Sequence, residues 1–186
     1  DPSAGLAAYA NRVVAAIDGD PDTVLVAMSL GSFTAPLVAA RVPLRMLVFV
    51  NAMIPMPGET AGAWWENTGS EAARTEAARA GGYDPGFDLD TYFLHDVPPT
   101  IAAEGEPYQR PEAEIAFAEP CAFGAWPDIP IHVIAGRDDR FFPVAFQRRV
   151  ARDRLGLEID VLPGGHLIAL AHPRPLADAL LGYLGG

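Results

Sequence analysis

The chain contains no lysine, because all 13 of its basic residues are arginines, and it has a single cysteine, Cys121. It also lacks the run of about 18 apolar residues that a membrane-spanning helix requires. The formal net charge of −11 leaves no broad cationic face, which argues against nucleic acid or an anionic membrane as the partner. One cysteine cannot close an internal disulfide, so we expect a buried, reduced thiol and a cytoplasmic protein.

The opening residues, Asp1 to Gly5, do not show the basic and hydrophobic regions of a signal peptide. Export is left open only for a longer chain that begins upstream of Asp1.

Half of the residues are hydrophobic and 20% are charged, which is typical of a compact globular domain. Short apolar runs rich in Val, Leu and Ile indicate strands that are buried on both faces, as in a parallel sheet. Helices between them make βαβ units. Predicted strands cover 23–28, 45–50, 131–135 and 157–162, and predicted helices cover 6–17, 33–41, 143–154 and 175–184.

Residues 51–128 interrupt this alternation and are rich in Pro, Gly, Glu and aromatic residues. We interpret this segment as a helical cap insertion that packs over the sheet, and residues 1–50 with 129–186 as the core. The predicted class is therefore α/β, a mostly parallel sheet flanked by helices. Within the insertion, helices are predicted near 70–80, 88–95 and 111–118.

Ser29 lies between a predicted strand and a predicted helix, in the sequence Ala27-Met28-Ser29-Leu30-Gly31. A nucleophilic serine must project from a tight turn, and small residues two positions before and after it make room for that turn. The N–H of Leu30 would then lie at a helix N-terminus and could donate to an oxyanion. The alternative is that Ser29 only caps the helix, because serine is a favoured N-cap residue.

Two more polar positions follow predicted strands. Asp138 and Asp139 come after 131–135, and His166 comes after 157–162. The carboxyl ends of parallel strands lie at the sheet edge where ligands bind, and histidine is well suited to proton transfer near neutral pH. Both aspartates are candidates for an acid, although we favour a turn or capping role for Asp138. The other histidines, His95, His132 and His172, are interpreted as structural or solvated.

The order serine, aspartate, histidine, each after a strand, resembles the α/β-hydrolase superfamily over the whole chain. The similar segments are the elbow around Ser29, Gly136-x-x-Asp139-x-x-x-Pro143 and Pro163-Gly164-Gly165-His166. The comparison makes Asp139 the acid and residues 51–128 the cap. The sequence looks most similar to the small-capped group that includes plant methylesterases and hydroxynitrile lyases.

Two departures from the family pattern matter. The family normally has several strands before the segment where this chain starts, and a loop there supplies a second oxyanion donor. Here only the Leu30 N–H can be assigned, and the strand before Ser29 would be an exposed apolar edge. We therefore expect a longer protein, with N-terminal residues missing, cleaved off or supplied by a second polypeptide. Met28 stands where relatives often carry a polar residue, which makes the pocket floor more apolar.

The resemblance implies a serine hydrolase, a carboxylesterase that cleaves a small-molecule ester through an acyl-enzyme on Ser29, without cofactor or metal. His166 would act as base and Asp139 would orient it. Hydroxynitrile lyase-like cleavage by the same triad is one alternative, but the plant lyases use a cap lysine and this chain has none. A non-catalytic binding protein of the same fold is another. A metal hydrolase is disfavoured, because four histidines and one cysteine show no ligand spacing.

Substrate contacts are predicted at Met28, Trp64, Trp65 and Phe93. An aromatic-lined pocket suits an apolar or aromatic substrate group. The alternative for the cap aromatics is that they form the core of the insertion. The oligomeric state stays open.

Overall fold

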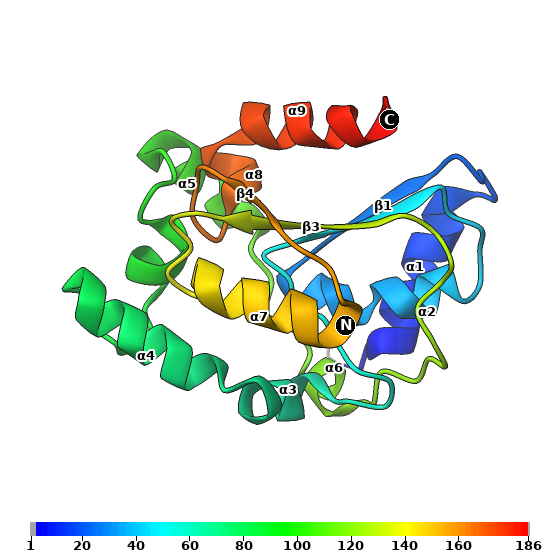
Figure 1. The fold of residues 1–186 in the computed structure, drawn as a ribbon, viewed down its shortest axis with the longest axis horizontal. Coiled ribbons are helices and arrows are strands. Elements are labelled where there is room, and N and C mark those ends of the chain that lie inside the picture. The colour runs from blue at the N-terminus through cyan, green and yellow to red at the C-terminus, as the bar shows by residue number, and fades with distance from the viewer. Residues whose placement is uncertain (1–2, 186) are drawn as a thin grey trace.

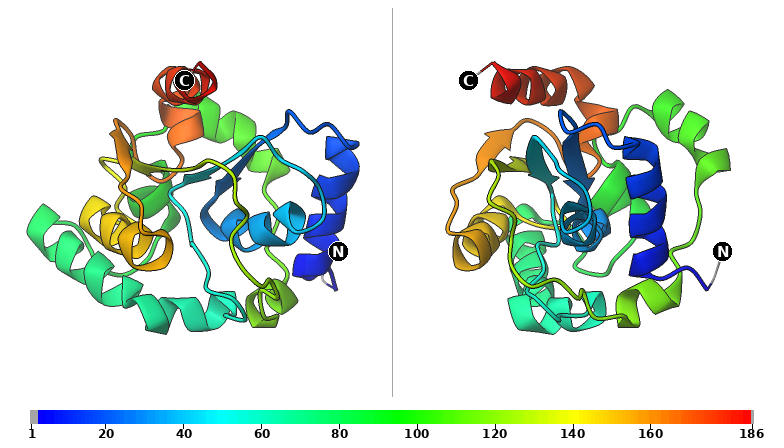
Figure 2. Two further views of the ribbon diagram at one scale, coloured as in Figure 1. Left: turned by 45° about the vertical axis from the view of Figure 1, so that its right-hand side comes forward. Right: turned by 90° about the vertical axis from the view of Figure 1, so that its right-hand side faces the viewer.

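A four-stranded parallel sheet with helices on both faces forms the centre of the computed structural model, which describes residues 3–185 (Figures 1 and 2). The strand order is β1-β2-β3-β4, and each neighbouring pair is parallel. This confirms the predicted α/β class. The strands are β1 (Val24–Met28), β2 (Met46–Val50), β3 (Ile131–Gly136) and β4 (Asp160–Leu162).

Helix α1 precedes the first strand, and the other helices lie in the connections between the strands and after the last one. Their bounds are α1 (Leu6–Ile17), α2 (Ala35–Ala39), α3 (Ala61–Thr68), α4 (Ser70–Gly81), α5 (Pro99–Gly105), α6 (Glu114–Ala118), α7 (Val144–Leu155), α8 (Ile168–Ala171) and α9 (Pro173–Leu184). Shorter turns are a 3-10 turn at Ser29–Phe33, a π-helical turn at Asp90–Leu94 and a 3-10 turn at Glu106–Tyr108. No helix within residues 3–185 has both the length and the apolar character needed to cross a membrane.

Strand β2 explains how the two layers of helices are held to the sheet. All five of its residues are buried, which accounts for the unbroken apolar run in the sequence. Successive side chains of a strand point to opposite faces. Leu47 and Phe49 join a cluster with residues of α1, α2 and α7, whereas Val48 joins a second cluster with Leu176 of α9. Helix α9 therefore covers one face and α1, α2 and α7 cover the other (Figure 1).

The insertion shares the core of the sheet. Met53 and Ile54, near its start, and Cys121 and Phe123, near its end, belong to the same hydrophobic cluster as β2. The segment is therefore anchored to the sheet by apolar packing at both of its ends. Its assignment as a cap remains a prediction.

The predicted elements differ from the structure mainly inside the insertion. Helix α3 was not predicted, because it has only eight residues and buries only Ala61, Trp64 and the polar Thr68. Helix α5 buries no residue, so it carries no periodic signal at all. The last strand is shorter than predicted, since residues 157–159 lie outside β4.

Candidate active site

The carboxyl ends of three strands bring Ser29, Asp139 and His166 together. The Nε2 atom of His166 lies 3.1 Å from Ser29 Oγ, and its Nδ1 atom lies 3.0 Å from Asp139 Oδ2. The carboxylate accepts from Nδ1, so the hydrogen-bond network assigns the proton to Nδ1 and leaves Nε2 free to accept from the serine hydroxyl. His166 is 1% exposed and Asp139 is 4% exposed, whereas Ser29 is partly exposed. The nucleophile candidate is thus the member that a substrate can approach.

Ser29 occupies a strained turn directly after β1. Its φ is +48°, in the left-handed region, where a residue with a Cβ atom costs about 1–2 kcal/mol. Its carbonyl accepts from the Met53 N–H at 3.1 Å, which helps to hold the turn. Ser29 begins a 3-10 turn, and the first amides of such a turn have no acceptor within it. The Leu30 N–H is therefore placed to act as an oxyanion donor.

Four donors hold the Asp139 carboxylate. Its Oδ1 atom accepts from the backbone N–H groups of Phe141 at 2.8 Å and Phe142 at 2.9 Å. Its Oδ2 atom accepts from Gln147 Nε2 at 3.3 Å and from His166. A carboxylate with this many donors is oriented before any substrate binds.

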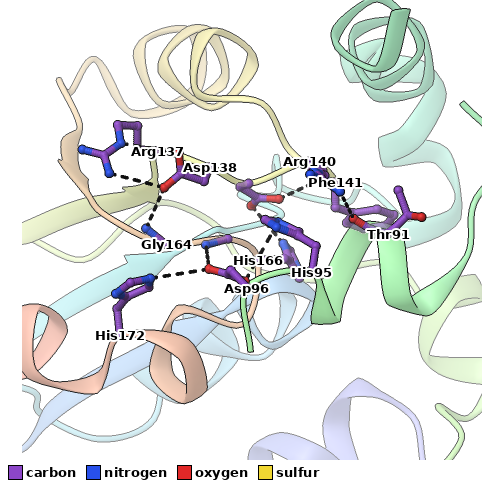
Figure 3. A network of polar contacts seen from close by, with 12 residues as sticks. Thr91, His95, Asp96, Arg137, Asp138, Arg140, Phe141, Gly164, His166 and His172 are labelled. Carbon is purple, nitrogen blue, oxygen red and sulfur yellow. Dashed lines mark hydrogen bonds and ion pairs between the residues drawn. The ribbon is translucent and has the colours of Figure 1, made fainter. Parts of the chain in front are cut away.

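Asp138, the other acid candidate, hydrogen-bonds to Gly164 instead of His166. Its Oδ2 atom accepts from the Gly164 N–H at 3.2 Å, and its own N–H donates to the Gly164 carbonyl at 3.0 Å (Figure 3). Asp138 therefore ties the turn after β3 to the loop after β4.

Sequence reasoning missed Asn51, which is fully buried at the end of β2 with a φ of +45°. Its Oδ1 atom accepts from the Gly136 N–H at 2.7 Å. Its Nδ2 atom donates to the carbonyls of Gly165 at 3.1 Å and His166 at 2.8 Å. One side chain thus ties the end of β3 to the His166 loop. A polar residue directly after a buried strand was the available signal, the same one that pointed to Asp139 and His166.

The predicted pocket residues are placed in different surroundings. The Phe93 ring stacks on the His166 imidazole, with centroids 4.6 Å apart and planes 20° apart. Trp65 packs edge-on against Phe141 at 5.6 Å. Met28 packs against the cluster that α9 covers.

The prediction for Trp64 is corrected. Its side chain has no exposed surface, and its indole N–H donates to the Ile54 carbonyl at 3.0 Å. The ring packs against Phe142 and Phe146. Trp64 therefore belongs to the hydrophobic core, because α3 turns this side chain inward while the adjacent Trp65 stays partly exposed at the edge of the same cluster.

Phe141 packs against His166 and also lines an open pocket. The pocket has a volume of about 340 Å³. The centroid of the Phe141 ring lies 5.1 Å from that of His166. Phe141 was not predicted, since nothing in its local sequence separates it from a core aromatic. The lining residues are Trp65, Glu71, Arg74, Phe87 and Phe141.

The remaining histidines occupy two places. His132 stacks on Tyr183 at 3.8 Å, on the side of the sheet covered by α9. His95 and His172 both lie beside Asp96, near the His166 loop. Within residues 3–185 no group of three or more His, Cys, Asp or Glu side chains is arranged to hold a metal ion.

The parallel sheet flanked by helices is the fold of an α/β hydrolase. The model of the alpha/beta hydrolase family matches residues 1–179, and the chain belongs to this family. This confirms the resemblance seen in the sequence.

Solved structures with similar folds include enzymes named as esterases. A pyrethroid hydrolase from Sphingobium faniae JZ-2 aligns with a TM-score of 0.70 and 18% identity, over 98% of this chain and 79% of that chain. A polyneuridine aldehyde esterase aligns with a TM-score of 0.73 and 17% identity, over 97% and 80%. A methylesterase from Arabidopsis aligns with a TM-score of 0.71 and 16% identity, over 97% and 78%. At these identities the likeness shows the fold alone. A search of curated proteins found no match.

Proposed function

We propose that this chain hydrolyses a small carboxylic ester through an acyl-enzyme on Ser29. The observation that carries the proposal is the position of His166 between Ser29 Oγ at 3.1 Å and Asp139 Oδ2 at 3.0 Å. A base oriented by a carboxylate and within reach of a hydroxyl is the arrangement that activates a serine nucleophile. Membership of the alpha/beta hydrolase family supports the same reaction class.

Each proposed step uses one of these groups. Ser29 Oγ bonds to the ester carbonyl carbon while its proton passes to His166 Nε2, and the Leu30 N–H donates to the resulting oxyanion. The carbon–oxygen bond to the alcohol then breaks, and the alcohol oxygen takes the proton from His166. A water molecule attacks the acyl carbon with His166 again accepting a proton, which returns to Ser29 as the acid leaves. Asp139 stabilises the imidazolium in both halves of the reaction.

The surroundings of His166 favour an apolar substrate. Phe93 and Phe141 both contact its ring, and Phe141 also lines the pocket with Trp65 and Phe87. Aromatic walls of this kind suit an apolar or aromatic acyl or alcohol group. We therefore propose short esters with one aromatic or branched group as the substrate class.

Substitution of Ser29 tests the proposal. Ser29→Ala is expected to lower kcat on a p-nitrophenyl ester by about 10³-fold or more. Ser32→Ala is the matched control, because Ser32 Oγ is buried in the same turn and has no hydrogen-bond partner within residues 3–185. This control should keep parental activity. Equal rates for Ser29→Ala and the parent would remove the hypothesis.

A fluorophosphonate probe separates catalysis from mere binding. Ser29 Oγ would bond to phosphorus, fluoride would leave, and His166 would take the hydroxyl proton. Labelling is expected in the parent and in Ser32→Ala, and is expected to be lost in Ser29→Ala. An unlabelled parent that also fails on a panel of short, long and aromatic esters would favour a binding protein.

A further inference from the structure

The loop that carries His166 is held from two directions. From the sheet, Asn51 donates to the carbonyls of Gly165 and His166. From the insertion, Asp96 Oδ2 accepts from the Gly165 N–H at 2.6 Å. Both backbone polar groups of Gly165 are therefore hydrogen-bonded, the carbonyl to Asn51 at the end of β2 and the N–H to Asp96 in the insertion. The backbone directly before His166 thus has a defined orientation.

Gly165 is the residue that permits this approach. A Cβ atom at that position would lie 2.7 Å from Asp96 Oδ1 and 2.7 Å from His95 Nε2, well inside contact distance. The insertion therefore reaches the loop only because residue 165 has no side chain. The second glycine of the Pro-Gly-Gly-His segment is therefore required by the close approach of His95 and Asp96, which lie outside that segment.

The surroundings of Asp96 include buried polar atoms that make no hydrogen bond to the part of the chain that the structure describes, which is unfavourable for stability. Asp96 Oδ1 and His95 Nε2 are both buried, and neither has a hydrogen-bond partner within residues 3–185. They lie 3.9 Å apart, and His172 Nε2 lies 3.7 Å from Asp96 Oδ2. A buried polar atom without a partner lowers the stability of the folded state. Such a cost, directly beside a catalytic loop, is typical of a functional arrangement.

The insertion also contacts the imidazole ring of His166. Phe93 stacks on the His166 ring, and Asp96, three residues later, holds the backbone before it. We infer that Asp96 is a positioning residue for His166, and that the segment Phe93–Asp96 makes the position of the base depend on the insertion. The inference rests on the proposed ester hydrolysis for its kinetic consequence, but its structural part concerns only the orientation of His166.

The expected effect lies in kcat. Asp96 contacts the loop, so its removal shifts the imidazole relative to Ser29 Oγ. A misplacement of about 1 Å can lower a rate on the order of 10²-fold. We therefore expect Asp96→Ala to lower kcat by about 10- to 100-fold and to change KM by less than about threefold.

Asp96→Asn is the rescue variant, because its amide oxygen can still accept from the Gly165 N–H while the charge is gone. It should keep at least about half of the parental kcat. Asp90→Ala is the matched control, since Asp90 is an exposed aspartate at the start of the π-helical turn that leads to Asp96, and it should behave like the parent. A kcat for Asp96→Ala equal to that of the parent would overturn the inference, and so would equal losses in Asp96→Asn and Asp96→Ala.

A readout independent of turnover is the downfield proton resonance of the hydrogen bond between His166 Nδ1 and Asp139. It should be present in the parent and in Asp96→Asn, and broadened or absent in Asp96→Ala. If the parent shows the resonance but hydrolyses no ester, the proposed function fails while the positioning role is still tested. An unchanged resonance in folded Asp96→Ala contradicts the positioning role.

Gly165→Ala tests the same contact if Asp96→Ala does not fold. Its methyl group would push the carboxylate away while every polar side chain is kept. We expect the same loss of kcat and of the resonance. Parental kcat and an unchanged resonance in Gly165→Ala would overturn the inference.

Discussion

Removing the Asn51 side chain is expected to destabilise the protein strongly. Asn51→Ala takes the acceptor from the buried Gly136 N–H and the donor from the carbonyls of Gly165 and His166. One buried polar group without a partner costs about 1–3 kcal/mol. Alanine also tolerates the φ of +45° less well than asparagine does. We therefore expect a loss of about 3–5 kcal/mol in the free energy of unfolding, a large part of the roughly 5–15 kcal/mol of a typical domain.

The nearly isosteric Asn51→Asp should also destabilise the protein, by an amount that depends on pH. One carboxylate oxygen can still accept from the Gly136 N–H, but the other faces two carbonyl oxygens. Burial and the nearby Asp139 carboxylate should raise the pKa of the introduced carboxyl group in the folded state above its ordinary value of about 3.9. The penalty is then small near pH 4 and grows as the pH rises.

Urea unfolding followed by tryptophan fluorescence measures both effects. Asn11→Ala is the control, because Asn11 makes one exposed hydrogen bond, from Arg41 Nη1 at 2.7 Å. A surface change of this kind should stay within about 0.5 kcal/mol of the parent. An Asn51→Ala variant within about 1 kcal/mol of the parent would refute the argument, and so would an Asn51→Asp penalty that shrinks as the pH rises.

Two further predictions concern buried ionisable groups. Burial alone would raise the pKa of Glu59, but hydrogen bonds from Arg154, Asn67 and the Met56 N–H lower the pKa below 4.5 overall. The stabilising contribution of Glu59 should therefore be present above pH 4.5 and be lost as the pH falls through the lowered folded-state pKa. Arg154→Met leaves the Glu59 carboxylate buried without its opposite charge, with only Asn67 and the Met56 N–H still donating to it. It should cost about 3–5 kcal/mol at pH 7 and less near pH 4 in denaturant titrations. An equal loss at both pH values would contradict this. Burial, and then the Glu59 charge, raise the pKa of the Cys121 thiol to about 12, so a maleimide at pH 8 should modify native protein far more slowly than unfolded protein. Equal rates in the two states would show that the thiol is accessible.

The sheet could be predicted from the sequence because its signals are local. The unbroken apolar run of β2 reflects burial on both faces, and the tight turns after β1, β3 and β4 carry Ser29, Asp139 and His166. Parallel strands in register place such turns at one edge. The positions of the three residues after parallel strands therefore predicted that they meet, and the resemblance to the α/β-hydrolase superfamily selected Asp139 over Asp138.

The supports of the triad could not be predicted in this way. Asn51 and Gly136 are 85 residues apart, and Asp96 and Gly165 are 69 residues apart. The full burial of Trp64 and the partial burial of Trp65 likewise follow from how α3 packs. Local sequence determines where a strand ends and which polar residue follows it. Only tertiary packing decides which distant side chain faces that residue, because hydrogen bonds act within about 3 Å and small rotations of a helix change the partner.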